Sequence, residues 1–425
     1  MKDEFRTIEI APAVRLCSYE TDRFTTGIVT VRFTVPLTEE RYCENAMLPL
    51  VLTRSNEDYP TLIELTKRIA DLYGAHLVPM SGKRGDTQEI TLGITTIDNK
   101  FALEGEDILL DAAKFLFSLI FRPNVSDGAF LDTEVEQERR IAIERVINEL
   151  NDKRHYAAKR MKEEMFAGEA YALNSQGSVE GLQKVTSKSL YEAYLEMIKG
   201  AAIQINVVGS SDAKRIADLF ESCIAGVERE PAILFTSVLS EAETVKRVVE
   251  ELPVNQGKLV MGFRLGATDM ETEYEKYKSM CDVFGGGVHS RLFNVVREEM
   301  SLCYYCSSRC VRDKEFMMVQ SGIENENAEV AEKEILNQLR YVVNDLIEDD
   351  LEKSKLSMKD MLATVCDTPD DIMGWMLLQE QEEFVTPEEH LEKLMAVTLE
   401  DVRSAAAAVT LDTVYLLKGT GEVQS

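Results

Sequence analysis

The sequence contains the same short patterns twice, and this repetition constrains the fold more than any other feature. Ile69-Ala-Asp-Leu-Tyr-Gly74 matches Met280-Cys-Asp-Val-Phe-Gly285, so Asp71 corresponds to Asp282 at a shift of 282 − 71 = 211 residues. Val185-Thr, followed by Leu190 and Ala193, matches Val397-Thr, followed by Val402 and Ala405, at a shift of 397 − 185 = 212 residues. Two matches at nearly the same shift indicate an internal duplication. We therefore expect two domains of one fold.

Both helices and strands are predicted within each half. Residues 28–35 alternate between apolar and polar side chains, which is typical of a half-buried strand. Helical spacing of apolar residues predicts helices at 60–73 and 106–121, and a long charged helix is expected from about 128 to 165. A capped helix beginning near 185 leads into a strand at 203–209. The class is α+β: two duplicated domains, each a mostly antiparallel sheet with helices packed on one face.

A segment with charged residues and two prolines separates the two halves. Pro231 and Pro253 bracket a stretch whose composition suits a linker. We expect a first domain over residues 1–225, a linker over 226–245 and a second domain over 246–425.

Composition narrows the classes of partner and the compartment. The 425 residues include 75 acidic and 47 basic side chains, a net charge of −28 that repels phosphate backbones and anionic membranes. We expect neither nucleic acid nor membrane as a partner. No long apolar segment and no secretion signal is evident, and the eight cysteines fit reduced thiols. A cytoplasmic location is expected.

A family resemblance rests on motifs in both halves. Gly285-Gly-Gly-Val-His-Ser-Arg-Leu-Phe293, then Val296-Arg-Glu-Glu299 and Leu302-Cys-Tyr304, resembles the second-domain signature of pitrilysin/insulinase-type zinc peptidases. The first half supplies Tyr59-Pro60, Phe121-Arg-Pro-Asn124 and Glu138-Arg139, so the resemblance covers essentially the whole chain.

The resemblance also implies where a zinc site would lie. Family members that cut peptides carry His-x-x-Glu-His on a first-domain helix and a further glutamate ligand on a later helix. The corresponding segment here is Ala46-Met-Leu-Pro49-Leu50, and the later ligand position is occupied by Arg145, although Glu138 is retained. Asn45 is expected to cap the helix, which would place Pro49 in its first turn. We expect no metal, no cofactor and no catalytic residue in this chain.

The cysteines offer one alternative metal site. Cys303, Cys306 and Cys310, with His289 nearby, satisfy a zinc ligand count. On a regular strand, however, Cys303 and Cys306 would point to opposite faces, so we favour reduced thiols over a metal centre.

Arg297 and Tyr304 match the family's arginine and tyrosine that hold the substrate backbone beside the zinc. Arginine can donate to a peptide carbonyl, and tyrosine can hydrogen-bond an oxygen that develops negative charge. Ordinary structural roles are the alternative: Arg297 paired with Glu298 or Glu299, and Tyr304 packed in a strand.

The resemblance gives three hypotheses for function. In the first, the chain is a non-catalytic, peptide-binding subunit of a heterodimeric zinc endopeptidase, inactive alone, whose homologous partner carries the zinc motif. In the second, it is an inactive peptidase-fold scaffold or protein-binding protein. In the third, it is a homodimer that binds unfolded peptide without hydrolysis.

Overall fold

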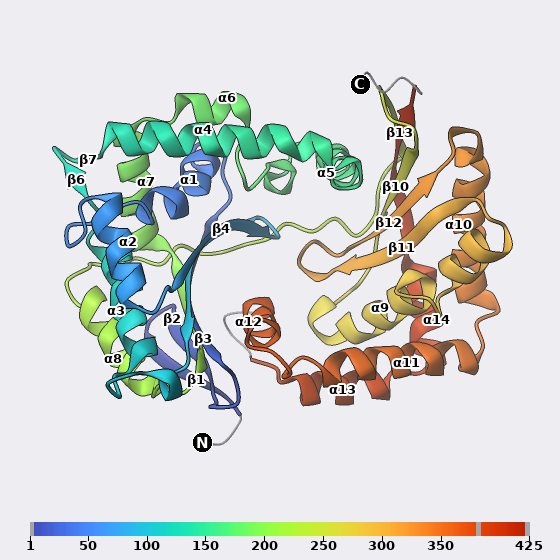
Figure 1. Ribbon diagram of the computed structural model, residues 1–425. Helices are drawn as coiled ribbons and strands as arrows, with labels where there is room; N and C mark the ends of the chain where they lie inside the picture. Colours follow the sequence, from blue (N-terminus) through green and yellow to red (C-terminus); the bar gives the residue numbers. More distant parts are fainter. Residues whose placement is uncertain (1–3, 380–383, 421–425) are drawn as a thin grey trace. The chain divides into compact units, whose positions relative to one another are not determined.

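The computed structural model describes residues 4–379 and 384–420, and the chain forms two compact units (Figure 1). Unit 1 comprises Met1–Ile147, Leu173–Phe235 and Thr364–Thr386. Unit 2 comprises Asn148–Ala172, Thr236–Ala363 and Pro387–Ser425. Each unit is therefore assembled from segments of both halves of the chain, unlike the contiguous domains 1–225 and 246–425 expected from the sequence. Residues 226–245, the expected linker, contain no helix or strand.

Unit 1 is built on a six-stranded sheet in the order β1-β2-β8-β3-β5-β4, in which only the β2–β8 pair is parallel. The strands are β1 (Phe5–Ala11), β2 (Val14–Glu20), β3 (Thr26–Pro36), β4 (His76–Arg84), β5 (Thr87–Ile97) and β8 (Ala202–Gly209). A short hairpin joins β6 (Val125–Ser126) to β7 (Ala129–Phe130).

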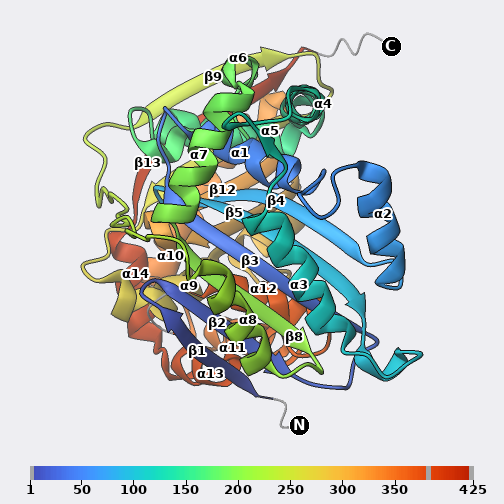
Figure 2. The same ribbon diagram turned by 90° about the vertical axis from the view of Figure 1, so that its left-hand side faces the viewer.

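Helices cover one face of this sheet, and Figure 2 shows α3, α7 and α8 in front of the strands. One apolar core joins the strands to these helices, with the inward-facing residues of β3 at its centre: Val29, Val31, Phe33 and Val35. The helices of unit 1 are α1 (Tyr42–Leu52), α2 (Leu62–Asp71), α3 (Ile108–Phe121), α4 (Asp132–Asn148), α6 (Val179–Lys184), α7 (Ser187–Gly200), α8 (Ala213–Ile224) and α12 (Pro369–Leu378).

Unit 2 contains a five-stranded sheet in the order β11-β12-β10-β13-β9, in which only the β13–β9 pair is parallel. Its strands are β9 (Lys246–Leu252), β10 (Gly257–Arg264), β11 (Cys303–Val311), β12 (Phe316–Ile323) and β13 (Thr410–Gly419). Its helices are α5 (Lys153–Met165), α9 (Met270–Gly285), the π-helix η4 (Leu292–Glu299), α10 (Ala328–Asn344), α11 (Glu348–Ala363), α13 (Pro387–Ala396) and α14 (Leu399–Ala408).

The two sheets share one topology. The order β2-β8-β3-β5-β4 in unit 1 matches β9-β13-β10-β12-β11 in unit 2, and each has one parallel pair at the same position. This agreement is what the repeated sequence patterns predict. The expected class, two mostly antiparallel sheets with packed helices, is confirmed by the structure and by the solved structures described below.

A second helical layer, supplied by the opposite half of the sequence, distinguishes both units from a simple two-layer domain. In unit 1, α12 packs on β3 and β8 through the cluster formed by Ile28, Val208, Ile372, Met373 and Met376. The strand expected to be half-buried is therefore buried on both faces.

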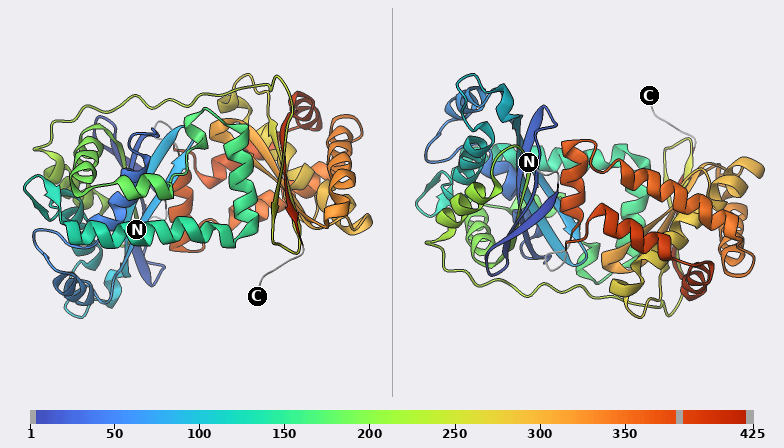
Figure 3. Two further views of the ribbon diagram at one scale, coloured as in Figure 1. Left: turned by 90° about the horizontal axis from the view of Figure 1, so that it is seen from above. Right: turned by 90° about the horizontal axis from the view of Figure 1, so that it is seen from below.

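In unit 2 the corresponding layer is α5, which packs on β10 and β13 through Ala157, Met161 and Met165. Figure 3 (left view) shows this green helix on one side of the sheet and the orange helix α10 on the other. The approach is close: a Cβ built on Gly262 would lie 2.8 Å from the Met161 sulfur.

The prediction of one continuous helix over 128–165 is wrong. It is interrupted after Asn148 by a 3-10 turn, Glu149–Asn151, and restarts at Lys153. Asp152 caps the new helix by accepting hydrogen bonds from the N–H groups of Arg154 and His155. The break divides an N-terminal part that belongs to unit 1 from a C-terminal part that belongs to unit 2.

Candidate functional site

The positions of the family's zinc motif lie on α1 and carry no metal ligand. Ala46 is 5% exposed and Leu50 is 6% exposed, and Pro49 between them is also buried. Leu50 belongs to the main core of unit 1, so this part of the helix is built into the protein interior as ordinary apolar packing. Within the described residues, no group of three or more histidine, cysteine, aspartate or glutamate side chains could hold a metal ion.

The N-terminal boundary of α1 differs from the expectation. The helix begins at Tyr42, and Arg41 is the N-cap residue, without a side-chain cap. Asn45 is therefore inside the helix, and Pro49 lies beyond the first turn. Because Pro49 has no N–H group, the carbonyl of Asn45 lacks its usual donor four residues later. The prediction that Asn45 caps the helix is wrong.

The retained glutamate of α4 is held by arginine. Glu138 is 5% exposed, and its carboxylate lies 3.3 Å from the guanidinium of Arg54, just after the end of α1. Burial raises the pKa of Glu138, while the charges of Arg54 and Arg145 act in the opposite direction. Arg145, which follows Glu138 by seven residues (145 − 138) on the same helix, is exposed. Cationic side chains thus accompany a carboxylate at the place where the resemblance implies a zinc ion, and they cannot bind one.

Arg54 was not among the candidates from the sequence, although it completes this arrangement. Its guanidinium also donates to Gln137, and the neighbouring Ser55 hydroxyl donates to Glu134 at 3.0 Å. The only sequence signal for this contact is that Arg54 follows directly after the apolar helix α1.

The three cysteines of β11 form no single cluster: Cys303 and Cys306 contact each other, and Cys310 contacts a cysteine of another element. A register shift between Cys303 and Tyr305 inserts Tyr304 as an extra residue, so Cys303 and Cys306 share the buried face. The prediction of opposite faces is wrong for this reason. A hydrogen bond with the Cys306 thiol lowers the pKa of Cys303 to about 7. Cys310 instead contacts Cys281 on α9.

His289, the fourth group of the alternative zinc site, is also engaged elsewhere. Its Nε2 atom lies 2.8 Å from the carboxylate of Asp282, which accepts a further hydrogen bond from the Ser354 hydroxyl at 2.5 Å. These contacts fix the glycine-rich turn to α9 and α11. They give His289 a structural role.

Arg297 and Tyr304 lie in unit 2, on η4 and at the bulge of β11 respectively. The Arg297 side chain is 40% exposed, 3.5 Å from Glu298 and stacked over the Phe293 ring. Tyr304 is 60% exposed, and its hydroxyl donates to Glu324 at 2.7 Å, which raises the pKa of the phenol. Both side chains are thus accessible, and each is held by a surface carboxylate.

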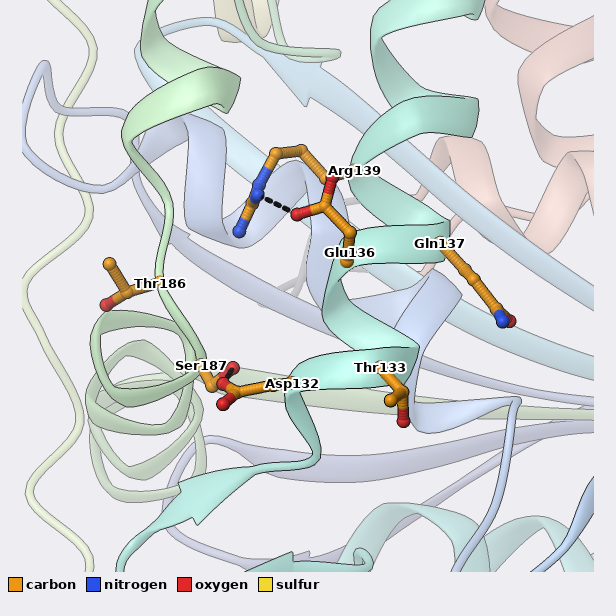
Figure 4. Close-up of a pocket in the computed structure, with 7 residues that line it drawn as sticks. All are labelled: Asp132, Thr133, Glu136, Gln137, Arg139, Thr186 and Ser187. Carbon is orange, nitrogen blue, oxygen red and sulfur yellow. Dashed lines mark hydrogen bonds and ion pairs between the residues drawn. The ribbon is translucent and has the colours of Figure 1, made fainter.

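A polar hollow of about 610 Å³ lies elsewhere in unit 1, where α4 and α7 begin (Figure 4). Most of its polar groups pair with one another or with the backbone: Ser187 donates to Asp132, Arg139 pairs with Glu136, and Arg139 also donates to the Val185 carbonyl at 2.7 Å. In Figure 4, Thr133 and Gln137 point away from this group. Among the described residues, the one buried polar atom of the hollow without a partner is Nε of Arg139, which is a donor and cannot bind a metal.

Comparison with known sequences gives the family. The pattern of the peptidase M16 inactive domain matches residues 184–358. The chain is also 30% identical over 403 residues to a protein of Bacillus subtilis (strain 168) described as "Probable inactive metalloprotease YmfF", covering 94% of this chain and 95% of that protein. The chain therefore belongs to the M16 peptidase family, as a non-catalytic member without the zinc ligands.

Solved structures share the fold. A conserved protein from Enterococcus faecalis V583 superposes with a TM-score of 0.86 at 24% identity, over 99% of this chain and 100% of that one. A protease from Helicobacter pylori gives a TM-score of 0.80 at 15% identity, over 98% and 100% of the two chains. Among the residues that the structure describes, no helix has the length and apolar character needed to cross a membrane.

Proposed function

We propose that this chain is the non-catalytic, peptide-binding subunit of a heterodimeric zinc endopeptidase of the cytoplasm. A homologous chain with the His-x-x-Glu-His motif supplies the metal. Arg297 and Tyr304 hold the backbone of an unfolded peptide beside that metal, and this chain alone hydrolyses nothing.

The contrast between the two sets of family positions supports this proposal. The former ligand positions are filled by buried apolar side chains or by arginine, whereas Arg297 and Tyr304 are exposed. The Arg297–Glu298 contact is an exposed ion pair, a kind that contributes only about 0–1 kcal/mol, and the Tyr304–Glu324 hydrogen bond is formed by a tyrosine that is itself exposed. A peptide can therefore replace these acids at little cost.

The chemistry of the two side chains suits peptide binding. The Arg297 guanidinium carries several N–H donors for peptide carbonyl oxygens. The Tyr304 hydroxyl now donates to Glu324, and it can donate in the same way to the carbonyl oxygen on which negative charge develops during attack. Neither side chain can activate water, so a partner's zinc is required for cleavage.

Reconstitution tests the proposal. The chain is purified from its native cell, the accompanying chain of similar mass is isolated, and each is assayed alone and mixed on an unfolded peptide. We expect zinc-dependent cleavage only in the mixture. Arg297→Ala or Tyr304→Phe should reduce kcat/KM about tenfold, because the loss of one such hydrogen bond costs about 1.4 kcal/mol.

The matched control is Arg309→Ala, which removes an exposed arginine from the same strand, β11. It should leave cleavage unchanged, and all variants should still associate with the partner. Full activity of the Arg297→Ala/Tyr304→Phe double variant would rule out a contribution of this chain to the active site.

The second candidate is an inactive scaffold, and one observation favours it. Arg297 and Tyr304 already have carboxylate partners within unit 2, as a purely structural role would require. A chain that purifies without a motif-bearing companion, as a monomer or homodimer that does not cleave, would support this alternative.

A further inference from the structure

A small pocket in unit 1 lies apart from the former zinc positions and has no assigned role. It is formed where β3 ends, where α1 begins and where the last two turns of α7 approach the segment after α8. Its volume is about 240 Å³. Apolar groups form most of its wall: Val35, Pro36, Ala193, Met197 and Ala232.

One buried polar side chain lines this apolar pocket. Asn45 is 4% exposed, and within the described part of the chain its side-chain amide makes no hydrogen bond. Because Asn45 lines the pocket, its amide can hydrogen-bond a group that enters the pocket. The amide offers a carbonyl oxygen that accepts and an NH2 group that donates, which together complement the N–H and C=O of a peptide group.

The charged rim of the pocket disfavours an anionic ligand. The guanidinium of Arg41 binds the Glu196 carboxylate through two contacts, 2.9 and 2.6 Å, and lies 4.0 Å from Glu192. These acids occupy Arg41, the one cation among the described residues that line the pocket. A neutral group is therefore favoured over a carboxylate.

We propose that this pocket binds one apolar residue of an extended peptide. A side chain of leucine size fills the cavity, and an adjacent peptide group pairs with the Asn45 amide. The volume is below the roughly 300–1,000 Å³ of pockets for drug-sized ligands, so it accommodates a single residue. The site belongs to unit 1 and is independent of Arg297, Tyr304 and any zinc-bearing partner.

Nuclear magnetic resonance with methyl-labelled methionine tests this site, because Met197 lines the pocket. Its signal is assigned with Met197→Leu. The probes are N-acetyl-leucine N-methylamide, the matching glycine compound and N-acetyl-leucine with a free carboxylate. We expect a saturable shift of the Met197 signal with the leucine amide, and binding at least tenfold weaker for the other two.

Variants locate the binding. Gly200 lines the pocket, and a Cβ added there meets only the Glu230 carbonyl oxygen, at 3.8 Å, so an alanine fits without a clash. Gly200→Leu should abolish the shift, Gly200→Ala should preserve it, and Asn45→Ala should weaken binding about tenfold, with melting curves confirming the fold.

Three results would overturn the proposal. One is the absence of a saturable shift in the unmodified chain, and another is equal binding by Gly200→Leu. The third is displacement of a co-purified partner chain by the leucine amide, which would assign the pocket to a subunit interface. Because no cleavage is measured, failure here leaves the zinc-partner hypothesis untouched, and failure of reconstitution leaves this site untouched.

Discussion

Substitution of Arg32 tests most directly how unit 1 holds α12, a helix from the C-terminal half of the sequence. This side chain on β3 is buried at 2% exposure and donates to the carbonyls of Leu377 and Gln379, at the C-terminus of α12. It also contacts Glu89 at 3.0 Å and Gln204 at 2.6 Å. Burial lowers the pKa of Arg32 to about 10, so it stays charged at neutral pH. Arg32→Met keeps the apolar volume and removes every donor.

The free-energy cost of Arg32→Met depends on which hydrogen-bond donors the acceptors of Arg32 retain. Glu89 keeps an ion pair with Arg84 at 3.3 Å, the Leu377 carbonyl keeps a donor from the same arginine, and Gln204 keeps Arg15. Only the Gln379 carbonyl loses the sole side-chain donor described here. Removing one member of a buried ionic network costs about 3–5 kcal/mol. We therefore expect the lower end, about 3 kcal/mol, or roughly a hundredfold in the equilibrium for releasing α12.

Hydrogen exchange followed by mass spectrometry measures this locally. Peptides covering α12 should lose protection in Arg32→Met, whereas peptides covering α5 in unit 2 should not. Arg264→Met, which removes a donor to the last carbonyl of α5, should give the opposite pattern. Arg84→Met, a more exposed neighbour, is the control and should have a smaller effect. A loss below about 1 kcal/mol, or equal loss at both helices, would refute this account of the anchoring.

Two further predictions concern metal and thiol chemistry. The purified chain should contain far less than one zinc per molecule by elemental analysis. A variant in which all four family positions, the three ligands and the base, are restored should bind zinc. If that variant does not bind zinc, α1 and α4 are not placed as in an active family member. The restoring changes are Ala46→His, Pro49→Glu, Leu50→His and Arg145→Glu. Alkylation of Cys303 should accelerate as pH rises through about 7, because the thiolate is the nucleophile, and Cys306→Ala should move this transition upward. A transition near the ordinary cysteine value in the unmodified chain would contradict the contact between the two thiols.

Much of the fold was predictable because local patterns specify it. The alternation in β3 and the capping box at Thr186 place a strand and a helix correctly from nearby residues alone. The exchanged helices were not predictable in the same way. Thr30 and Arg32 look like a solvent-facing side of β3, and only the contacts with α12, more than 340 residues later, explain why they are buried.

The site shows a similar division. The loss of zinc ligands could be inferred by aligning Ala46, Pro49 and Leu50 with a family motif, because ligand chemistry depends on residue type. The geometry of the cysteines could not be inferred from the sequence, because the extra residue Tyr304 reverses the face of the strand on which each later side chain lies. Arg54 was missed because its partner, Glu138, is 84 positions away in the sequence (138 − 54).

The reciprocal exchange of α5 and α12 has a consequence for synthesis on the ribosome. Unit 1 is complete only after residue 386 has emerged, and unit 2 only after β13, close to the end of the chain. Until then, the face of β3 and β8 that receives Met373 and Met376 has no cover. A gene cut within 226–245 would therefore not yield two self-sufficient proteins, since each product would carry a helix whose sheet was translated elsewhere.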